Sequence, residues 1–192
     1  YAGFTGVTGA GTALTGMNGS FGDTTRISAA SGVNYTGFAL ATVAGSGTAL
    51  TGVAISFNDG TKGSGSGINY SGLAGLATVA GDGTADVTNT TSFALTGPNA
   101  GTGASGIAYS AFDAASNTTA VTGAVGFNDG LKSNQGMTFA SATTVAGTGT
   151  ISNVAGGFAD NTLVSAARKL RAASGCVARR SRMKPSASCR CG

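Results

Sequence analysis

Apolar and small or polar residues alternate with a period of two along short stretches of this chain. Val53, Ile55 and Phe57, for example, alternate with Ala54 and Ser56. A period of two is typical of a β-strand with one buried face, because successive side chains point to opposite sides of the backbone. Gly-rich and Asn-Asp-Gly stretches separate these segments and are typical of turns. The pattern therefore predicts an all-β chain of short strands.

Three kinds of segment recur along the chain at intervals of roughly 30 to 39 residues. The first reads Gly, apolar, any residue and then Tyr or Phe, and the second reads Val-Ala-Gly-x-Gly-Thr. The third is built around a Phe that is often followed by Asn-Asp-Gly. Copies of the first begin at Gly32, Gly67, Gly106 and Gly136, copies of the second at Val43, Val79 and Val145, and the clearest copies of the third contain Phe57 and Phe127. Together they define about five imperfect repeats.

Repeats of this length, without helical spacers, predict a parallel β-helix or a related β-solenoid over residues 1–164. We expect a right-handed coil in which equivalent residues stack about 4.8 Å apart. The repeated aromatic positions would then form two ladders that cover one another's rings. The first ladder would contain Tyr35, Tyr70, Tyr109 and Phe139, and the second Phe57, Phe93 and Phe127.

The "VAGxGT", "FNDG" and "GINYSG" units of residues 1–164 resemble the β-helical stalks of bacterial autotransporter passengers and filamentous-haemagglutinin-type adhesins. The resemblance implies a structural or adhesive segment of a secreted protein at the bacterial cell surface. Such a segment would be a stiff rod that displays turn loops, such as 60–67 and 97–106, toward an unidentified host or matrix ligand. Exposed strand edges at the ends of a solenoid also favour end-to-end self-association.

The composition argues against an enzyme. The 192 residues include no His, no Trp and no Glu, and only 9% are charged, against about a quarter in ordinary domains. Without His, Ser-His or Cys-His nucleophile chemistry is unavailable. The acidic residues Asp23, Asp59 and Asp129 follow the Phe of the third segment, where we expect them to serve turns. A β-helical polysaccharide-active enzyme fragment is the less favoured alternative, because the acidic residues are scattered.

Calcium binding is the other alternative function. The stretch "AGDGTADVT" at residues 80–88 resembles the Gly- and Asp-rich nonapeptide of calcium-binding secreted repeats. Asp82 and Asp86 could supply oxygen ligands together with backbone carbonyls. The equivalent segments, however, carry Ser46 and Thr148 where Asp82 stands, so a ladder of metal sites is not expected. No other cofactor is indicated.

The composition changes abruptly after Val164. Residues 165–192 hold eight of the eleven basic residues and all three Cys, whereas the body carries three basic against seven acidic residues, a net charge of 3 − 7 = −4. We expect this tail to be disordered. Two interpretations remain open: a genuine basic tail that binds nucleic acid, or an artificial end. The chain begins without Met in half a repeat, which indicates a fragment, and it contains no apolar run near 20 residues, so we expect no membrane span.

Overall fold

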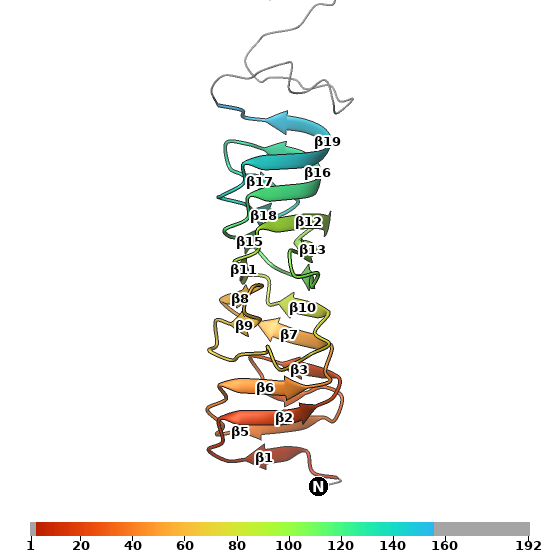
Figure 1. The fold of residues 1–192 in the computed structure, drawn as a ribbon, viewed down its shortest axis with the longest axis vertical. Coiled ribbons are helices and arrows are strands. Elements are labelled where there is room, and N and C mark those ends of the chain that lie inside the picture. The colour runs from red at the N-terminus through yellow and green to blue at the C-terminus, as the bar shows by residue number, and fades with distance from the viewer. Residues whose placement is uncertain (1–2, 156–192) are drawn as a thin grey trace, which may run out of the picture.

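The computed structural model describes residues 3–155, and these form an elongated stack of short strands with no helix (Figure 1). The architecture is a parallel β-solenoid of about five turns, as the periodicity predicts. None of the described segments forms a helix that is long and apolar enough to cross a membrane. The predicted boundary after Val164 and the basic tail of residues 165–192 lie outside the described residues.

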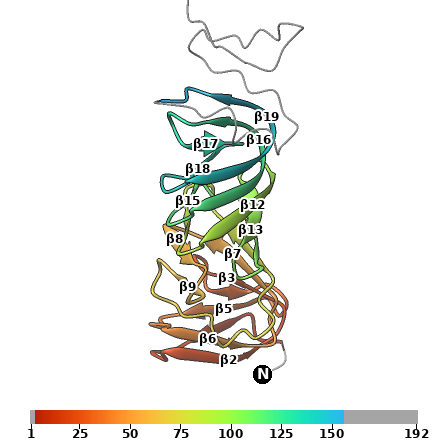
Figure 2. The ribbon, with the colours of Figure 1, turned by 45° about the horizontal axis from the view of Figure 1, so that its top comes forward.

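The strands form two rows along the stack, here called runs, and within each run neighbouring strands are hydrogen-bonded. In order, the first run contains β1 (Gly6–Thr8), β5 (Val33–Thr36), β4 (Ile27–Ser28), β3 (Ser20–Gly22), β7 (Ala49–Val53), β10 (Thr78–Gly81), β14 (Ala108–Ser110), β13 (Ala100–Gly103), β12 (Ser92–Gly97), β16 (Ala120–Asn128) and β19 (Thr144–Ser152). The second run contains β2 (Ala13–Met17), β6 (Thr42–Gly45), the segment 69–73, β9 (Gly63–Ser64), β8 (Ser56–Asn58), β11 (Asp86–Thr88), β15 (Ala114–Ala115), β18 (Met137–Thr138), β17 (Ser133–Asn134) and the end of β16. Strands β2 and β6 lie at one end of the stack, and β16 and β19 lie at the other (Figure 2).

Each repeat turns back once through a short antiparallel strand. These return strands are β4, β9, β13 and β17, and each pairs with a strand on either side in its own run. The other connections cross from one run to the other, three times per repeat. Because three is odd, equivalent segments of successive repeats fall in opposite runs. Copies of one motif therefore do not stack directly on each other.

This alternation makes the two predicted aromatic ladders wrong. Tyr35 pairs with Val7 in the register of β5, and Tyr109 pairs with Val79 in the register of β14. Tyr70 and Phe139 follow Asn69 and Thr138, which pair in the second run. The residues of the other expected ladder also stack on aliphatic side chains, with Phe57 beside Val87, Phe93 beside Val121 and Phe127 beside Ile151.

The rings instead contact one another across the core, between the two runs. Phe21 lies 6.2 Å from Tyr70, Phe57 lies 5.9 Å from Tyr109, and the centroid of Phe93 lies 5.9 Å from that of Phe139. In each pair the partner ring belongs to the second copy of the Gly-apolar-x-Tyr/Phe motif that follows the Phe in the sequence. All six rings are at most 2% exposed. Aromatic burial thus ties the two runs of strands together.

The Val-Ala-Gly-x-Gly-Thr segment forms a bulged corner between runs. Its Val is buried at Val43 and Val79, and the pairing register shifts just after Val79, between β10 and β7. A Cβ added at Gly81 would lie 2.5 Å from the carbonyl oxygen of Ala111. Only Gly permits such a close approach of the next turn. The repeated Gly is therefore required by the stacking of the backbone.

Candidate functional site

Two buried carboxylates lie in the core, at the ends of the Phe-containing strands. Asp23 and Asp59 are 1% and 2% exposed. Asp23 Oδ1 accepts hydrogen bonds from the Tyr70 hydroxyl, from Ser64 Oγ at 3.1 Å and from Ser66 Oγ at 2.7 Å. The partner phenol comes 47 residues later in the chain and from the opposite run. The backbone at Asp23 does turn, as expected, but its side chain serves the core.

The second cluster repeats this arrangement one unit further on. The Tyr109 hydroxyl and Ser105 Oγ both donate to Asp59 Oδ1, and the Ser105 backbone N–H donates to Oδ2 at 3.0 Å. The phenol again comes from far along the chain, 50 residues after the carboxylate. Sequence reasoning missed both clusters. Their signal is Phe-x-Asp in one repeat and Ser-Gly-Ile-x-Tyr two motif copies later, at residues 66–70 and 105–109.

The next unit replaces both sides of the cluster together. Leu95 stands two residues after Phe93, where Asp stands in the first two units, and the ring that meets Phe93 from the opposite run is Phe139, which has no hydroxyl. Gln135 stands where the cluster Ser would be. A buried polar group costs free energy unless it is hydrogen-bonded. The exchange of carboxylate and phenol as a pair indicates that the two groups are matched.

The phenols of the clusters stay neutral hydrogen-bond donors. Burial, followed by the neighbouring carboxylate Asp23, raises the pKa of Tyr70 far above its ordinary value. Burial also raises the pKa of Tyr109, and its hydrogen bond to Asp59 adds to the effect. Around Asp23, the Oδ2 atom and one guanidinium nitrogen of Arg26 are buried without a hydrogen-bond partner among residues 3–155. The clusters hold structure together and present no accessible acid or base.

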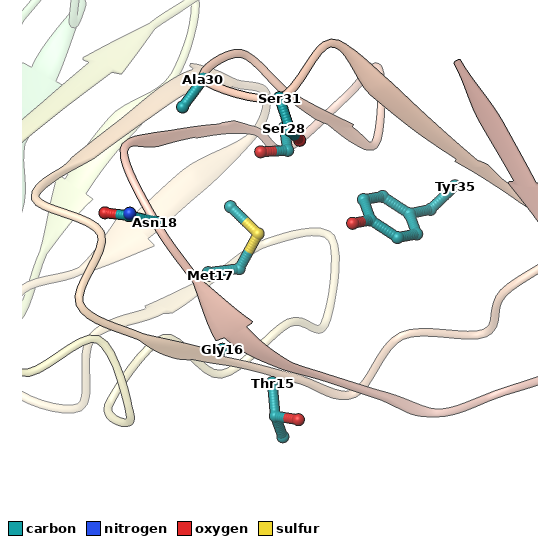
Figure 3. A pocket seen from close by; sticks show the side chains of 8 residues that line it. All are labelled: Thr15, Gly16, Met17, Asn18, Ser28, Ala30, Ser31 and Tyr35. Atoms are coloured by element: carbon teal, nitrogen blue, oxygen red, sulfur yellow. The ribbon is translucent and has the colours of Figure 1, made fainter. Parts of the chain in front are cut away.

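A small pocket of about 220 Å³ opens at the N-terminal end of the stack (Figure 3). Eight residues line it: Thr15, Gly16, Met17, Asn18, Ser28, Ala30, Ser31 and Tyr35. Met17 and Ser28 are buried, and the side chains of Met17, Ser28 and Tyr35 point toward a shared space, with Ser31 beside Ser28. The lining carries hydroxyls and an amide but no charge. Such a pocket suits a ligand group that accepts hydrogen bonds.

The two calcium candidates are engaged with different neighbours. Asp82 Oδ1 accepts hydrogen bonds from the Thr84 N–H at 2.9 Å and from Thr84 Oγ1 at 2.8 Å, and these bonds lower the pKa of Asp82. Burial raises the pKa of Asp86, and the carboxylate that adds to the rise is that of Asp113. Within residues 3–155, no group of three or more His, Cys, Asp or Glu side chains could hold a metal ion.

The loops expected to be displayed are tied to the core. In the loop 60–67, Ser64 and Ser66 both donate to the buried carboxylate Asp23. In the loop 97–106, Ser105 binds Asp59, and the Ala104 N–H donates to Thr90 Oγ1 at 2.8 Å. These segments therefore lie against the stack, and their outer surface is a fixed one.

Searches against protein-family models, curated proteins and solved structures gave no match to this chain. The class of the protein is thus defined by its fold, a β-solenoid repeat protein.

Proposed function

We propose that this chain is a structural or adhesive segment of a secreted bacterial surface protein, acting as a stiff rod without catalysis. The observation that carries the proposal is the pair of core clusters, in which Asp23 is bound by Tyr70 and Asp59 by Tyr109. Each cluster joins the two runs of strands and spans about fifty residues of chain. Bending the stack would stretch these buried, charge-assisted hydrogen bonds, which are among the strong ones in proteins.

The chemistry of the three acidic residues that follow a Phe supports a non-catalytic role. Asp23 and Asp59 are buried and occupied by hydroxyl donors, so a substrate has no access to them. Asp129 lies nearer the surface, 2.5 Å from Lys132 Nζ, and the hydrogen bond from that amine lowers its pKa. A carboxylate of lowered pKa is a poor general acid near neutral pH.

The location at the cell surface rests on the resemblance of the repeat units to secreted stalks and on the small number of charged residues. The test is an antibody raised against residues 1–164 and applied to the source bacterium. We expect it to label intact cells, and we expect mild external protease to remove the label. Label that requires permeabilised cells, or turnover of acidic polysaccharides by the purified chain, would contradict the proposal.

A further inference from the structure

The N-terminal pocket repeats the donor side of the two carboxylate clusters. Residues 31–35 read Ser-Gly-Val-Asn-Tyr, which matches Ser-Gly-Ile-Asn-Tyr at 66–70 and Ser-Gly-Ile-Ala-Tyr at 105–109. The backbone register agrees, because Ser28 pairs with Phe21 as Ser64 pairs with Phe57. Ser28, Ser31 and Tyr35 are therefore the counterparts of the three hydroxyls that bind Asp23.

In this first unit the three hydroxyls face the pocket. Ser28, Ser31 and Tyr35 all line it, and their side chains donate no hydrogen bond to any residue in 3–155. The Ser-Gly-x-x-Tyr sequence accompanies a carboxylate in both filled clusters, whereas the unit that lacks the carboxylate has Gln135 and Phe139 instead. The sequence of the first unit is thus the one that goes with a carboxylate.

The pairing order indicates where a carboxylate would enter. Strands β8, β11 and β15 pair in that order; Asp59 follows β8, and Tyr109 lies on β14, which leads into β15. Strands β3, β7 and β10 pair in the same way for Asp23 and Tyr70. By the same spacing Tyr35, which precedes β6, requires a strand two positions from β6, beside β2. Among residues 3–155, β2 pairs on one side only, with β6.

We propose that the pocket binds the carboxylate of a Phe-x-Asp strand from a second copy of this chain, paired parallel to the outer edge of β2. The Asp would accept hydrogen bonds from Ser28, Ser31 and Tyr35, and its Phe would pack on the Tyr35 ring as Phe57 packs on Tyr109. A donor strand and a receptor pocket at different places on one chain give a heterologous, head-to-tail contact, which builds filaments.

The chain carries the required donor sequence itself. The segment 127–129 reads Phe-Asn-Asp, but its strand β16 is already paired on both sides, with β17 and β19. Another copy, Phe158-Ala-Asp160, occurs further on, outside the described residues. The second molecule would present residues 158–160 to the pocket. This contact would extend the proposed rod, but its test does not depend on where the rod is used.

The first experiment measures peptide binding to the full chain by calorimetry, at a salt concentration that screens the basic tail. The probe is Ala-Ile-Ser-Phe-Asn-Asp-Gly, the sequence of residues 54–60, which contains the donor strand of the second cluster. Matched peptides carry Leu in place of the Asp or the same residues in scrambled order. We expect the Asp peptide to bind at least about tenfold more tightly than either control, the effect of a hydrogen-bonded charge.

The variant Tyr35→Phe removes one donor and keeps the ring, as Phe139 does naturally. It should fold as the wild type does, which a thermal melt checks. The affinity for the Asp peptide should fall by about tenfold, and the affinity for the Leu peptide should stay unchanged. Ser71→Ala removes an exposed hydroxyl that does not line the pocket and should have no effect. Equal binding of the Asp and Leu peptides, or equal binding to wild type and Tyr35→Phe, would overturn the carboxylate site.

Sedimentation velocity of the full chain tests the second copy as the occupant. We expect concentration-dependent oligomers that are lost in both Tyr35→Phe and Asp160→Leu. The Asp peptide should dissociate the oligomers of the wild type. A chain that stays monomeric, or oligomers that persist in both variants, would overturn the head-to-tail contact. Solution scattering at low concentration would still report whether the single molecule is a rod, so the proposed function fails or survives separately.

Discussion

The pairing of Asp59 with Tyr109 can be tested by converting it into the apolar pair that the next repeat contains. Asp59→Leu copies Leu95, and Tyr109→Phe copies Phe139. The first change alone removes the acceptor of three hydrogen bonds, one from Tyr109 and two from Ser105. Tyr109 is 2% exposed, so water cannot replace the lost acceptor there.

The expected free energies follow from burial. A buried hydroxyl left without a partner costs about 1–3 kcal/mol, whereas Ser105 is exposed and can bond to water, so Asp59→Leu should cost about 3 kcal/mol of unfolding free energy. Tyr109→Phe takes one donor from a buried carboxylate and should cost about 2 kcal/mol. The double variant leaves neither group unpaired and should cost only about 1–2 kcal/mol. The coupling energy between the two sites is then about 3–4 kcal/mol.

Urea unfolding of the four proteins, followed by circular dichroism, measures these values from the midpoints if the slopes agree. The most informative comparison is between Asp59→Leu and the double variant, because Tyr109→Phe should stabilise the Asp59→Leu protein. Additive costs, with the double variant less stable than the wild type by the sum of the two single costs, would refute the view that the carboxylate and the phenol form one matched unit.

Three further predictions concern pH, glycine and calcium. Folding raises the pKa of the phenols of Tyr70 and Tyr109. Their contribution to the free energy of unfolding is therefore complete below the unfolded pKa of about 10 and is lost as the pH rises above it. The urea midpoint should therefore hold steady between about pH 8 and about pH 9.5, which lie below the unfolded pKa of about 10, and it should fall steeply by about pH 11. An unchanged midpoint at about pH 11 would contradict the assigned burial of the two phenols. Gly81→Ala should cost about 2–3 kcal/mol in urea unfolding because the neighbouring carbonyl lies 2.5 Å from the new Cβ, whereas Gly97→Ala, with nothing within 4 Å, should change stability by less than about 0.5 kcal/mol. Millimolar calcium should leave the melting temperature unchanged in wild type and in Asp82→Asn alike; a rise in wild type alone would favour the calcium-binding alternative.

One four-residue sequence that occurs twice shows which features depend on local sequence and which depend on tertiary contacts. Phe-Asn-Asp-Gly occurs at 57–60 and again at 127–130. Asp59 is buried and bound by Tyr109, whereas Asp129 is partly exposed and paired with Lys132. Local sequence predicts the same turn in both places, and the backbone does turn in both. What differs is the partner some fifty residues later, which no local pattern identifies.

The alternation of period two and the spacing of Gly predict the all-β stack, because they are local properties that reflect strand and turn geometry. These local patterns do not indicate which copies of a motif contact one another. Because the chain crosses between the two runs three times per repeat, equivalent segments alternate between runs, so Tyr35 stacks on Val7 and not on Tyr70. Pairing across the core depends on the number of crossings per repeat, a property of the whole path of the chain, and that number brings Asp23 and Tyr70 together.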